Sequence, residues 1–397
     1  MLFFISFVCT ACTHPKEAIV NDPAVALNNT IKDNDGNARL EPQSGCYFGV
    51  VRDDLTLDTI RGYSVWLGFT PAAFVTFVKF PMRQQDIDKL KVIKEIIPTG
   101  GIVLVTLEPL DGLNTISKQD CQDFATLCVN YEKQGLGVMV RFAHEMNGTW
   151  YPWCQSPTLY KEKFRLLAQY VHTNTHNTAM LWTPNSGGGY PFLGGPYGVQ
   201  PGTPEYSVLD TDGNNKLDMN DDMYTPYYPG DDAVDWVGMS VYHWGQSYPW
   251  FENELPEARN FTDQITGNYN GLNGNQLAVP DFYSMFCNDG VHNKPMAIPE
   301  TAAFYNTEQG GASELAIKQA WWHQVFNHSG DTNDALDISV HFPKIKMINW
   351  FDIQKNEAEA KGNLVDWRIS GNTIIQSAFT RDQFLLENSH KYLLFAK

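Results

Sequence analysis

The chain has 397 residues, longer than most single domains but within the reach of one α/β barrel with insertions. Apolar residues make up 43% and charged residues 18%, so the chain can bury a large core and wholesale disorder is excluded. The 45 acidic residues outnumber the 28 Lys and Arg and give a formal net charge of −17, which argues against nucleic acid or an anionic membrane as the main partner. With 13% aromatic residues, the composition favours a soluble globular protein with a neutral ligand.

The beginning of the chain is predicted to be a secretory signal. Residues 1–19 open with an almost wholly apolar stretch that is too short to span a bilayer. A positively charged start is missing, so we interpret the signal as truncated at its beginning. Residues 20–45 lack periodicity and are predicted to form a mobile lead-in, followed by one folded domain over residues 46–397. We expect a secreted protein without a transmembrane helix, and we expect a monomer.

Eight short apolar segments are predicted to be strands. Most are continuous β-branched or apolar runs rather than alternating ones, which is typical of strands buried on both faces, as in a parallel sheet. They are Cys46–Val51, Ala73–Phe80, Ile102–Leu107, Gly137–Phe142, Ala179–Thr183, Trp236–Tyr242, Pro295–Ile298 and Ile345–Trp350.

Helical patterns fill the intervals between these segments. Ser117 precedes one such pattern, and Ser156 followed by Pro157 starts another. Alternation of eight strands with helices predicts the α/β class and a (β/α)₈ TIM barrel, with a long insertion between the fifth and sixth strands. A doubly wound open sheet is the main alternative, which is weakened because no Gly-rich phosphate loop follows the first strand.

The strongest local motif runs from Arg141 to Trp153. It begins at the end of the fourth predicted strand, where barrel enzymes place catalytic groups. Arg141, His144 and Glu145 would occupy neighbouring positions there, able to hydrogen-bond and position one carboxyl group, while Trp150 and Trp153 would offer flat apolar faces to a ligand. The alternative is a structural network of ion pairs at the rim of the barrel.

A second carboxylate, Glu300, ends the seventh predicted strand. The ends of strands four and seven face each other across the mouth of an eight-stranded barrel. Glu145 and Glu300 can therefore approach the separation of roughly 5 to 5.5 Å that a retaining glycosidase requires. One glutamate would protonate the leaving oxygen while the other attacks the anomeric carbon.

These residues resemble those of glycoside hydrolase family 26. The resemblance covers the chain from about the fourth strand onward and includes the run 227–238 before the sixth strand. The family belongs to a clan of retaining (β/α)₈ glycosidases and consists mainly of endo-β-1,4-mannanases, with β-1,3-xylanases and mixed-linkage β-glucanases among its members. The residues that carry the resemblance are His144-Glu145, Trp150, Tyr242, Glu300 and Trp350.

The resemblance implies that Glu145 is the acid/base and Glu300 the nucleophile. It further implies that His144 contacts the nucleophile or the sugar, that Tyr242 hydrogen-bonds the nucleophile, and that Trp150 and Trp350 flank the sugar. Pro299 departs from the small residue that is usual before the nucleophile, and proline removes a donor from the strand ladder. The complete set of predicted substrate-binding residues is Arg141, His144, Trp150, Trp153, Trp182, Tyr242 and Trp350.

A calcium loop is predicted in the insertion. Residues 210–221 place oxygen-bearing side chains at positions 1, 3, 5, 9 and 12, which is the ligand order of an EF-hand-type loop. Position 6 is Asn215 rather than Gly, and asparagine tolerates the left-handed conformation needed there. A solvated acidic loop is the alternative. The predicted ligands are Asp210, Asp212, Asn214, Lys216 through its backbone carbonyl, Asp218 and Asp221.

Together these features predict a secreted, retaining endo-β-glycosidase that acts on a neutral β-linked polysaccharide. We predict endo-β-1,4-mannanase activity first, with β-1,3-xylanase or mixed-linkage β-glucanase activity as the alternatives within the family. A non-hydrolytic glycan-binding barrel is the alternative of a different class. The histidines are scattered along the sequence and do not have the spacing of metal ligands. We therefore expect catalysis without a cofactor, and calcium only in a structural role.

Overall fold

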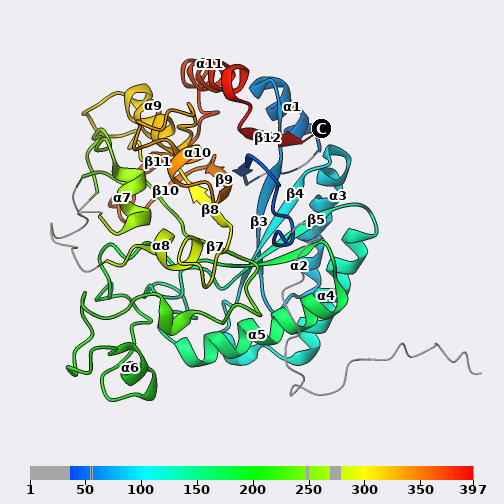
Figure 1. Cartoon of the computed structure of the whole chain (residues 1–397), viewed down its shortest axis with the longest axis vertical. Helices are drawn as coiled ribbons and strands as arrows, with labels where there is room; N and C mark the ends of the chain where they lie inside the picture. The colour runs from blue at the N-terminus through cyan, green and yellow to red at the C-terminus, as the bar shows by residue number, and fades with distance from the viewer. Residues whose placement is uncertain (1–35, 54, 56, 247–249, 269–278, 397) are drawn as a thin grey trace, which may run out of the picture.

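Eight parallel strands form a closed barrel, which confirms the predicted (β/α)₈ fold (Figure 1). The computed structural model describes residues 36–396 except 54, 56, 247–249 and 269–278, so the predicted signal segment lies outside the described residues. The barrel closes because its first strand pairs with its last, with Tyr47 opposite Met347 and Val51 opposite Phe351. The barrel strands are β1 (Cys46–Val51), β3 (Ala73–Lys79), β4 (Ile102–Glu108), β5 (Gly137–Phe142), β6 (Thr178–Trp182), β7 (Trp236–Gly238), β8 (Met296–Thr301) and β9 (Ile345–Phe351).

Two of these strands differ from the prediction near the mouth of the barrel. β7 ends at Gly238 rather than Tyr242, and beyond it only single bridges continue the pairing, such as the bridge from Ser240 to Asn185. β8 extends past Ile298 to Thr301, with a shift in its register against β9 between these two residues. Pro299 lies at this irregularity, where the ladder does not need the N–H that proline lacks.

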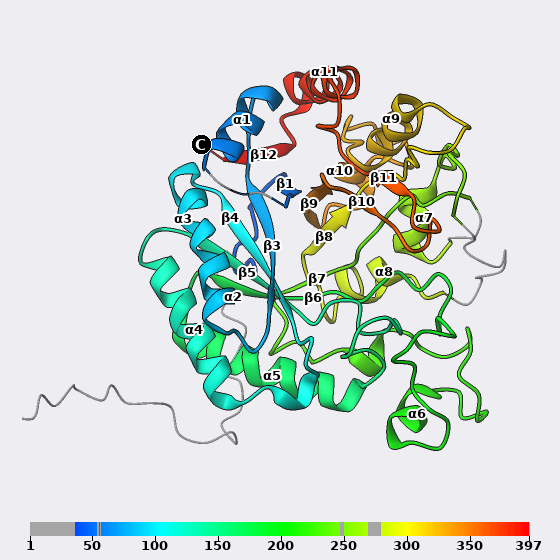
Figure 2. The same cartoon turned by 180° about the vertical axis from the view of Figure 1, so that it is seen from behind.

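The helices form an outer layer around the barrel, and from behind α2 to α5 are seen to cover β3, β4 and β5 (Figure 2). The side chain of Ser117 caps α4 and accepts from the Asp120 backbone N–H. No helix within the described ranges is long and apolar enough to cross a membrane. The α-helices are α1 (Leu57–Leu67), α2 (Gln84–Lys89), α3 (Ile93–Ile96), α4 (Lys118–Glu132), α5 (Pro157–Asn174), α6 (Pro204–Leu209), α7 (Asn260–Thr266), α8 (Phe282–Cys287), α9 (Glu314–Val325), α10 (Ile338–His341) and α11 (Thr373–His390).

Among the described residues, four short strands lie outside the barrel. β12 (Leu393–Ala396) extends the sheet beside the first residues of β1 and pairs on its other edge with β2 (Thr70–Pro71). The end of the chain is therefore attached at the amino-terminal end of the barrel wall. A hairpin of β10 (Gln354–Asn356) and β11 (Leu364–Asp366) follows β9 at the opposite, carboxyl end.

A long segment, residues 183–235, connects β6 to β7 and contains α6. Figure 1 shows α6 at the lower left edge of the molecule, away from the barrel strands. The first part of the segment lies nearer the mouth, because the Thr149 hydroxyl donates to the Phe192 carbonyl (2.7 Å) and the rings of Trp150 and Phe192 are in contact. The segment therefore reaches from the mouth of the barrel to its periphery.

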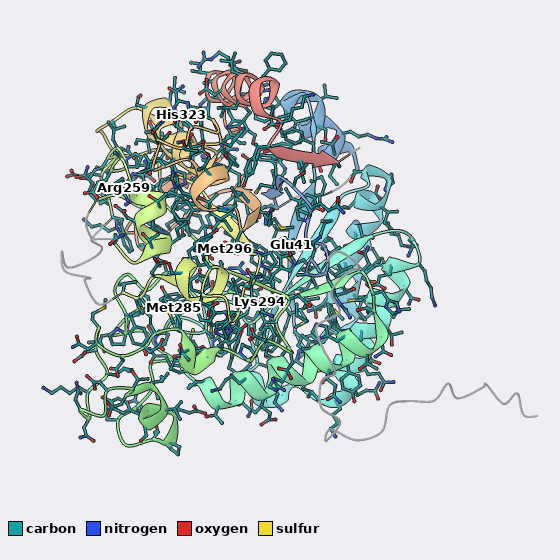
Figure 3. All side chains as sticks on the ribbon, in the orientation of Figure 1. Glu41, Arg259, Met285, Lys294, Met296 and His323 are labelled. Carbon is teal, nitrogen blue, oxygen red and sulfur yellow. The ribbon has the colours of Figure 1, made fainter. Side chains whose placement is uncertain are left out.

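Residues 36–45 belong to the predicted mobile lead-in, yet they pack against the amino-terminal end of the barrel. The guanidinium of Arg39 is buried and donates to the carbonyls of Thr178 (2.9 Å) and His172 (3.3 Å). Glu41 forms an ion pair with Lys344 (3.9 Å), and Figure 3 shows Glu41 over the centre of the molecule. Sequence periodicity missed this packing because it depends on single side chains and not on a regular element.

We predict that Arg39→Ala lowers the free energy of unfolding by about 3 kcal/mol, because several hydrogen bonds of a buried charged group are lost at once. Arg39→Lys keeps the charge but loses the forked geometry, so its loss should be intermediate. Urea unfolding monitored by tryptophan fluorescence measures both. An Arg39→Ala protein as stable as the parent would show that residues 36–45 do not stabilise the barrel.

Candidate active site

A buried arginine organises the carboxyl ends of several barrel strands. Arg141, on β5, is fully buried, and its Nη1 forms an ion pair with Oε1 of Glu300 on β8. Its Nε donates to the hydroxyl of Thr183 just after β6 (2.9 Å), and its Nη2 donates to the hydroxyl of Ser240 just after β7 (2.8 Å). One guanidinium therefore links the ends of β6, β7 and β8 and fixes the position of Glu300.

The second oxygen of Glu300 is also held. The Tyr242 hydroxyl donates to Oε2 of Glu300 (2.7 Å). Burial and the charge of Glu300 raise the pKa of Tyr242 well above its usual value, so this hydroxyl keeps its proton and stays a donor. Glu300 is only 8% exposed, and each of its oxygens accepts a hydrogen bond. These contacts hold the carboxyl group of Glu300 in a fixed orientation.

Glu145 lies in the loop after β5 in a different environment. Its backbone has a φ of 55°, a left-handed conformation that is uncommon outside glycine and clusters at functional sites. Its backbone N–H donates to the Thr183 carbonyl (2.8 Å), and its Oε2 accepts from the indole of Trp150 (3.0 Å). Burial, and then the charge of Glu300, raise the pKa of Glu145. The site therefore pairs a carboxyl group that tends to keep its proton with one that is held by a cation and a hydroxyl.

Two side chains fix the loop that carries Glu145. Asn147 and Asn185 bond reciprocally, since the Asn147 amide donates to the Asn185 carbonyl (3.0 Å) and the Asn185 N–H donates to Asn147 Oδ1 (2.8 Å). The indole of Trp153 donates to the carbonyl of His144 (2.7 Å). These hydrogen bonds attach the loop to the residues that follow β6 and also fix the conformation of the loop itself.

The predicted substrate-binding residues differ in their exposure and in the side chains they contact. Trp150 and Tyr242 are partly exposed and lie against Glu145 and Glu300 respectively. His144 is 3% exposed and contacts the rings of Tyr151 and Trp153. Burial, with the charge of Arg141, lowers the pKa of His144 well below its usual value, so the imidazole is neutral at neutral pH.

Three predicted sugar-contacting tryptophans, Trp153, Trp182 and Trp350, are wholly buried and offer no face to a ligand, which corrects the prediction. Trp182 and Trp350 point away from the barrel axis. The Trp182 ring packs on aromatic side chains of α8, and the Trp350 ring packs on Phe326 and Phe379 beside the outer helices. Side chains of successive strand residues point alternately into and out of the barrel. An error of one position in the predicted strand is therefore enough to select a residue that points outward.

Sequence reasoning missed Tyr151 and Glu108. Tyr151 is partly exposed, and the charges of Glu145, Glu300 and Glu108 add to burial in raising its pKa. Glu108 ends β4, and burial together with the charge of Glu300 raises its pKa to about 7. Glu108 could have been found by the reasoning used for Glu300, because it too is a carboxylate at the carboxyl end of a buried strand.

The predicted calcium loop folds back on itself. Carboxylate oxygens of Asp210, Asp212 and Asp221 lie within 4.8 Å of one another. Asn215 has a φ of 65°, the left-handed conformation expected at position 6, and its N–H donates to Asp210 Oδ2 (2.9 Å). Asp221 Oδ1 also accepts from the Thr211 N–H (2.6 Å). Three of the predicted ligands thus come together.

Comparisons with known proteins agree with this fold. The family model described as Glycosyl hydrolase family 26 matches residues 107–191, which include Glu145 but not Glu300. Endoglucanase H of Acetivibrio thermocellus is 22% identical over 290 residues, which are 70% of this chain and only 24% of that protein. The solved structure of a Cellulomonas fimi endo-β-1,4-mannanase double mutant shares the fold with a TM-score of 0.51 at 14% identity, covering 88% of this chain and 72% of that one.

The closed barrel carries two glutamates near the carboxyl ends of its strands, an arrangement that retaining glycosidases use. Residues 107–191 of the chain match the model of glycoside hydrolase family 26, in agreement with the resemblance found in the sequence.

Proposed function

We propose that this chain is a secreted, retaining endo-β-1,4-mannanase. The observation that carries the proposal is the contrast between the two glutamates. Glu300 is held by Arg141 and Tyr242, while Glu145 beside it has a raised pKa. A retaining glycosidase needs this pair, namely an ionised nucleophile and a protonated acid. Secretion is proposed from the apolar start of the sequence.

In the proposed mechanism Glu145 gives its proton to the oxygen of the scissile bond while Glu300 attacks the anomeric carbon from the other face. A covalent glycosyl-enzyme forms and the leaving sugar departs. Glu145, now ionised, takes a proton from water, which attacks the anomeric carbon and releases Glu300. Arg141 and Tyr242 hold the nucleophile in place throughout, and Trp150 orients the acid through its indole N–H.

The choice of mannan rests on the similar Cellulomonas fimi protein, which is an endo-β-1,4-mannanase, and on the predominance of that activity in the family. A mixed-linkage or other β-glucan is the second candidate, supported by the name of the similar Endoglucanase H. A β-1,3-xylan is the remaining alternative within the family. A non-hydrolytic glycan-binding barrel is disfavoured because both glutamates are present and held at the mouth.

We predict that the protein releases reducing ends from galactomannan faster than from mixed-linkage glucan or β-1,3-xylan. Glu300→Gln should lower turnover by a factor on the order of 10⁴ or more, since no group replaces the nucleophile. Glutamine is preferred to alanine here because its amide oxygen can still accept from the buried Arg141. Reducing-end assays on the three polymers in parallel measure both effects.

Each outcome of this assay has a definite meaning. Cleavage of glucan or xylan alone would keep the mechanism and change the substrate. Full activity in the Glu300→Gln protein would remove the proposed mechanism. If the parent protein cuts none of the three polymers, the endo-mannanase proposal fails.

We predict that Glu145→Ala lowers turnover of mannan by roughly 10²- to 10⁴-fold but has a much smaller effect on an aryl mannoside with a good leaving group, which needs little protonation. In the parent protein, activity on mannan should fall as the pH rises through the raised pKa of Glu145, because the ionised form has no proton to give. Equal losses on both substrates would contradict the acid role of Glu145.

We also propose that residues 210–221 bind Ca²⁺ in a structural role. The support is the grouping of Asp210, Asp212 and Asp221 and the left-handed Asn215 at position 6. Catalysis is proposed to need no cofactor.

Chelation with EGTA should lower the melting temperature by several degrees, and added Ca²⁺ should restore it, since an ion bound only to the native state stabilises that state. Asp212→Ala should abolish the response to Ca²⁺. Asn220→Ala is the matched control, because Asn220 is exposed in the same loop and lies outside the ligand positions. An identical melting temperature with and without EGTA in the parent protein would leave the acidic loop as a solvated turn.

A further inference from the structure

Most tryptophans of this protein are buried, and the few that are not mark the mouth of the barrel. All 11 tryptophans lie within the described residues, and four of them keep part of their surface exposed, namely Trp66, Trp150, Trp244 and Trp250. Trp66 lies beside β12, at the amino-terminal end of the barrel wall, and Trp150 donates to Glu145 at the mouth. Trp244 and Trp250 follow β7 and are therefore candidates for contact with a ligand.

The segment after β7 continues the barrel wall beside the end of β8. The Val241 N–H donates to the Glu300 carbonyl (3.1 Å), and the His243 N–H donates to the Ala302 carbonyl (3.0 Å). In an extended segment of this kind, successive side chains point to opposite sides. Val241 and His243 are both buried, and the ring of His243 lies against Trp321 on the outer helix α9. These two side chains therefore point away from the mouth.

The side chains between and after them point into the mouth. The Ser240 hydroxyl accepts from Arg141 (2.8 Å), and two residues later the Tyr242 hydroxyl donates to Glu300 (2.7 Å). Trp244 is two residues further along and lies on the same side, with its ring centroid 6.3 Å from that of Tyr242. A row of side chains that face the mouth therefore runs outward from Glu300 and ends at Trp244.

Trp250 extends this row. Its ring lies against the ring of Trp244, with centroids 5.2 Å apart and planes inclined at 33°. The chain turns at Gly245, whose φ of 137° favours glycine, and Glu254 holds the turn because its carboxylate accepts from the Gln246 N–H (2.8 Å). Single exposed apolar side chains are ordinary, but neighbouring ones that form a patch indicate a binding surface.

A buried tryptophan supports this surface from behind. Trp367 follows β11, and its ring meets that of Trp244 at 78° with centroids 4.8 Å apart. The same ring lies 5.3 Å from that of Tyr242. The indole N–H of Trp367 donates to the buried Glu357 (2.8 Å), which fixes its orientation. Trp244 is thus held in place before a ligand arrives, so little side-chain entropy is lost on binding.

The character of the surface narrows the chemistry of its ligand. Indole rings offer flat apolar faces, and the apolar face of a sugar ring fits such a surface. Neither Trp244 nor Trp250 brings a charge, and the net charge of −17 on the chain disfavours an anionic polymer. Because the surface begins beside Tyr242 and Glu300, a ligand bound there is continuous with one bound at the mouth.

We infer that Trp244 and Trp250 form a subsite that binds a further sugar of the polysaccharide chain, beyond the sugar that lies between Glu145 and Glu300. The two indoles stack on this sugar and hold a long neutral β-linked chain across the mouth. Chains that reach the subsite bind more tightly than chains that do not. The inference deepens the proposed function and rests on it for the class of polysaccharide.

Binding of a hexasaccharide, measured by isothermal titration calorimetry, tests the inference. The hexasaccharides come from β-1,4-mannan, mixed-linkage glucan and β-1,3-xylan, and all proteins carry Glu300→Gln so that no ligand is cut. Trp250→Ala should raise the dissociation constant of the bound hexasaccharide about fivefold to tenfold, because a stacking contact is lost. Trp244→Ala should have an effect of the same direction. Trp250→Phe should recover part of the affinity, because its ring is still flat and apolar.

Trp66→Ala is the matched control. Trp66 is also a partly exposed tryptophan, but it lies at the opposite end of the barrel wall, so its loss should leave the dissociation constant unchanged. The inference is overturned if Trp250→Ala and Trp66→Ala bind alike, or if no hexasaccharide binds the parent. It is also overturned if Trp250→Phe has the parent's melting temperature but binds as weakly as Trp250→Ala, because a flat ring would then not be the binding element.

Failure of this inference is distinct from failure of the proposed function. If the parent protein cuts mannan but Trp250→Ala and Trp66→Ala bind alike, only the subsite is rejected. If the parent cuts no polymer yet one hexasaccharide separates Trp250→Ala from Trp66→Ala, the subsite stands without the proposed activity.

Discussion

The active site depends on one buried charge, the guanidinium of Arg141. A fully buried arginine is tolerated only when its donors are paired, and here they bind Glu300, Thr183 and Ser240. Those partners come from the ends of β8, β6 and β7, so the need to neutralise Arg141 also holds the strand ends in place. The fixed position of Glu300 is thus a consequence of the electrostatics of the barrel mouth, because a buried cation without this partner would be strongly destabilising.

The same arrangement separates the behaviour of the two glutamates. Arg141 and Tyr242 hold both oxygens of Glu300, and burial, followed by the charge of Glu300, raises the pKa of Glu145. Glu145 therefore owes part of its raised pKa to its neighbour Glu300. The loop after β5 brings Glu145 close enough for this coupling, at the cost of a left-handed backbone that the bonds between Asn147 and Asn185 help to maintain.

The barrel and the two glutamates were predictable because they follow local rules. Continuous apolar runs mark strands buried on both faces, and carboxylates at the ends of such strands mark the mouth. The directions of Trp182 and Trp350 were not predictable in the same way. A strand that is apolar on both faces shows no alternation of apolar and polar residues. Which of its residues point into the barrel is therefore set by the pairing register across the whole sheet. Burial of Arg39 likewise depends on contacts with residues more than a hundred positions away.

The buried polar groups at the two ends of the barrel have different kinds of partner. At the mouth, Arg141 pairs with the side chains of Glu300, Thr183 and Ser240, and Tyr242 donates to the second oxygen of Glu300. At the amino-terminal end, the buried Arg39 donates instead to the backbone carbonyls of Thr178 and His172. The side chains at the mouth therefore need little rearrangement when a ligand arrives, which is the preorganisation that favours stabilisation of a transition state.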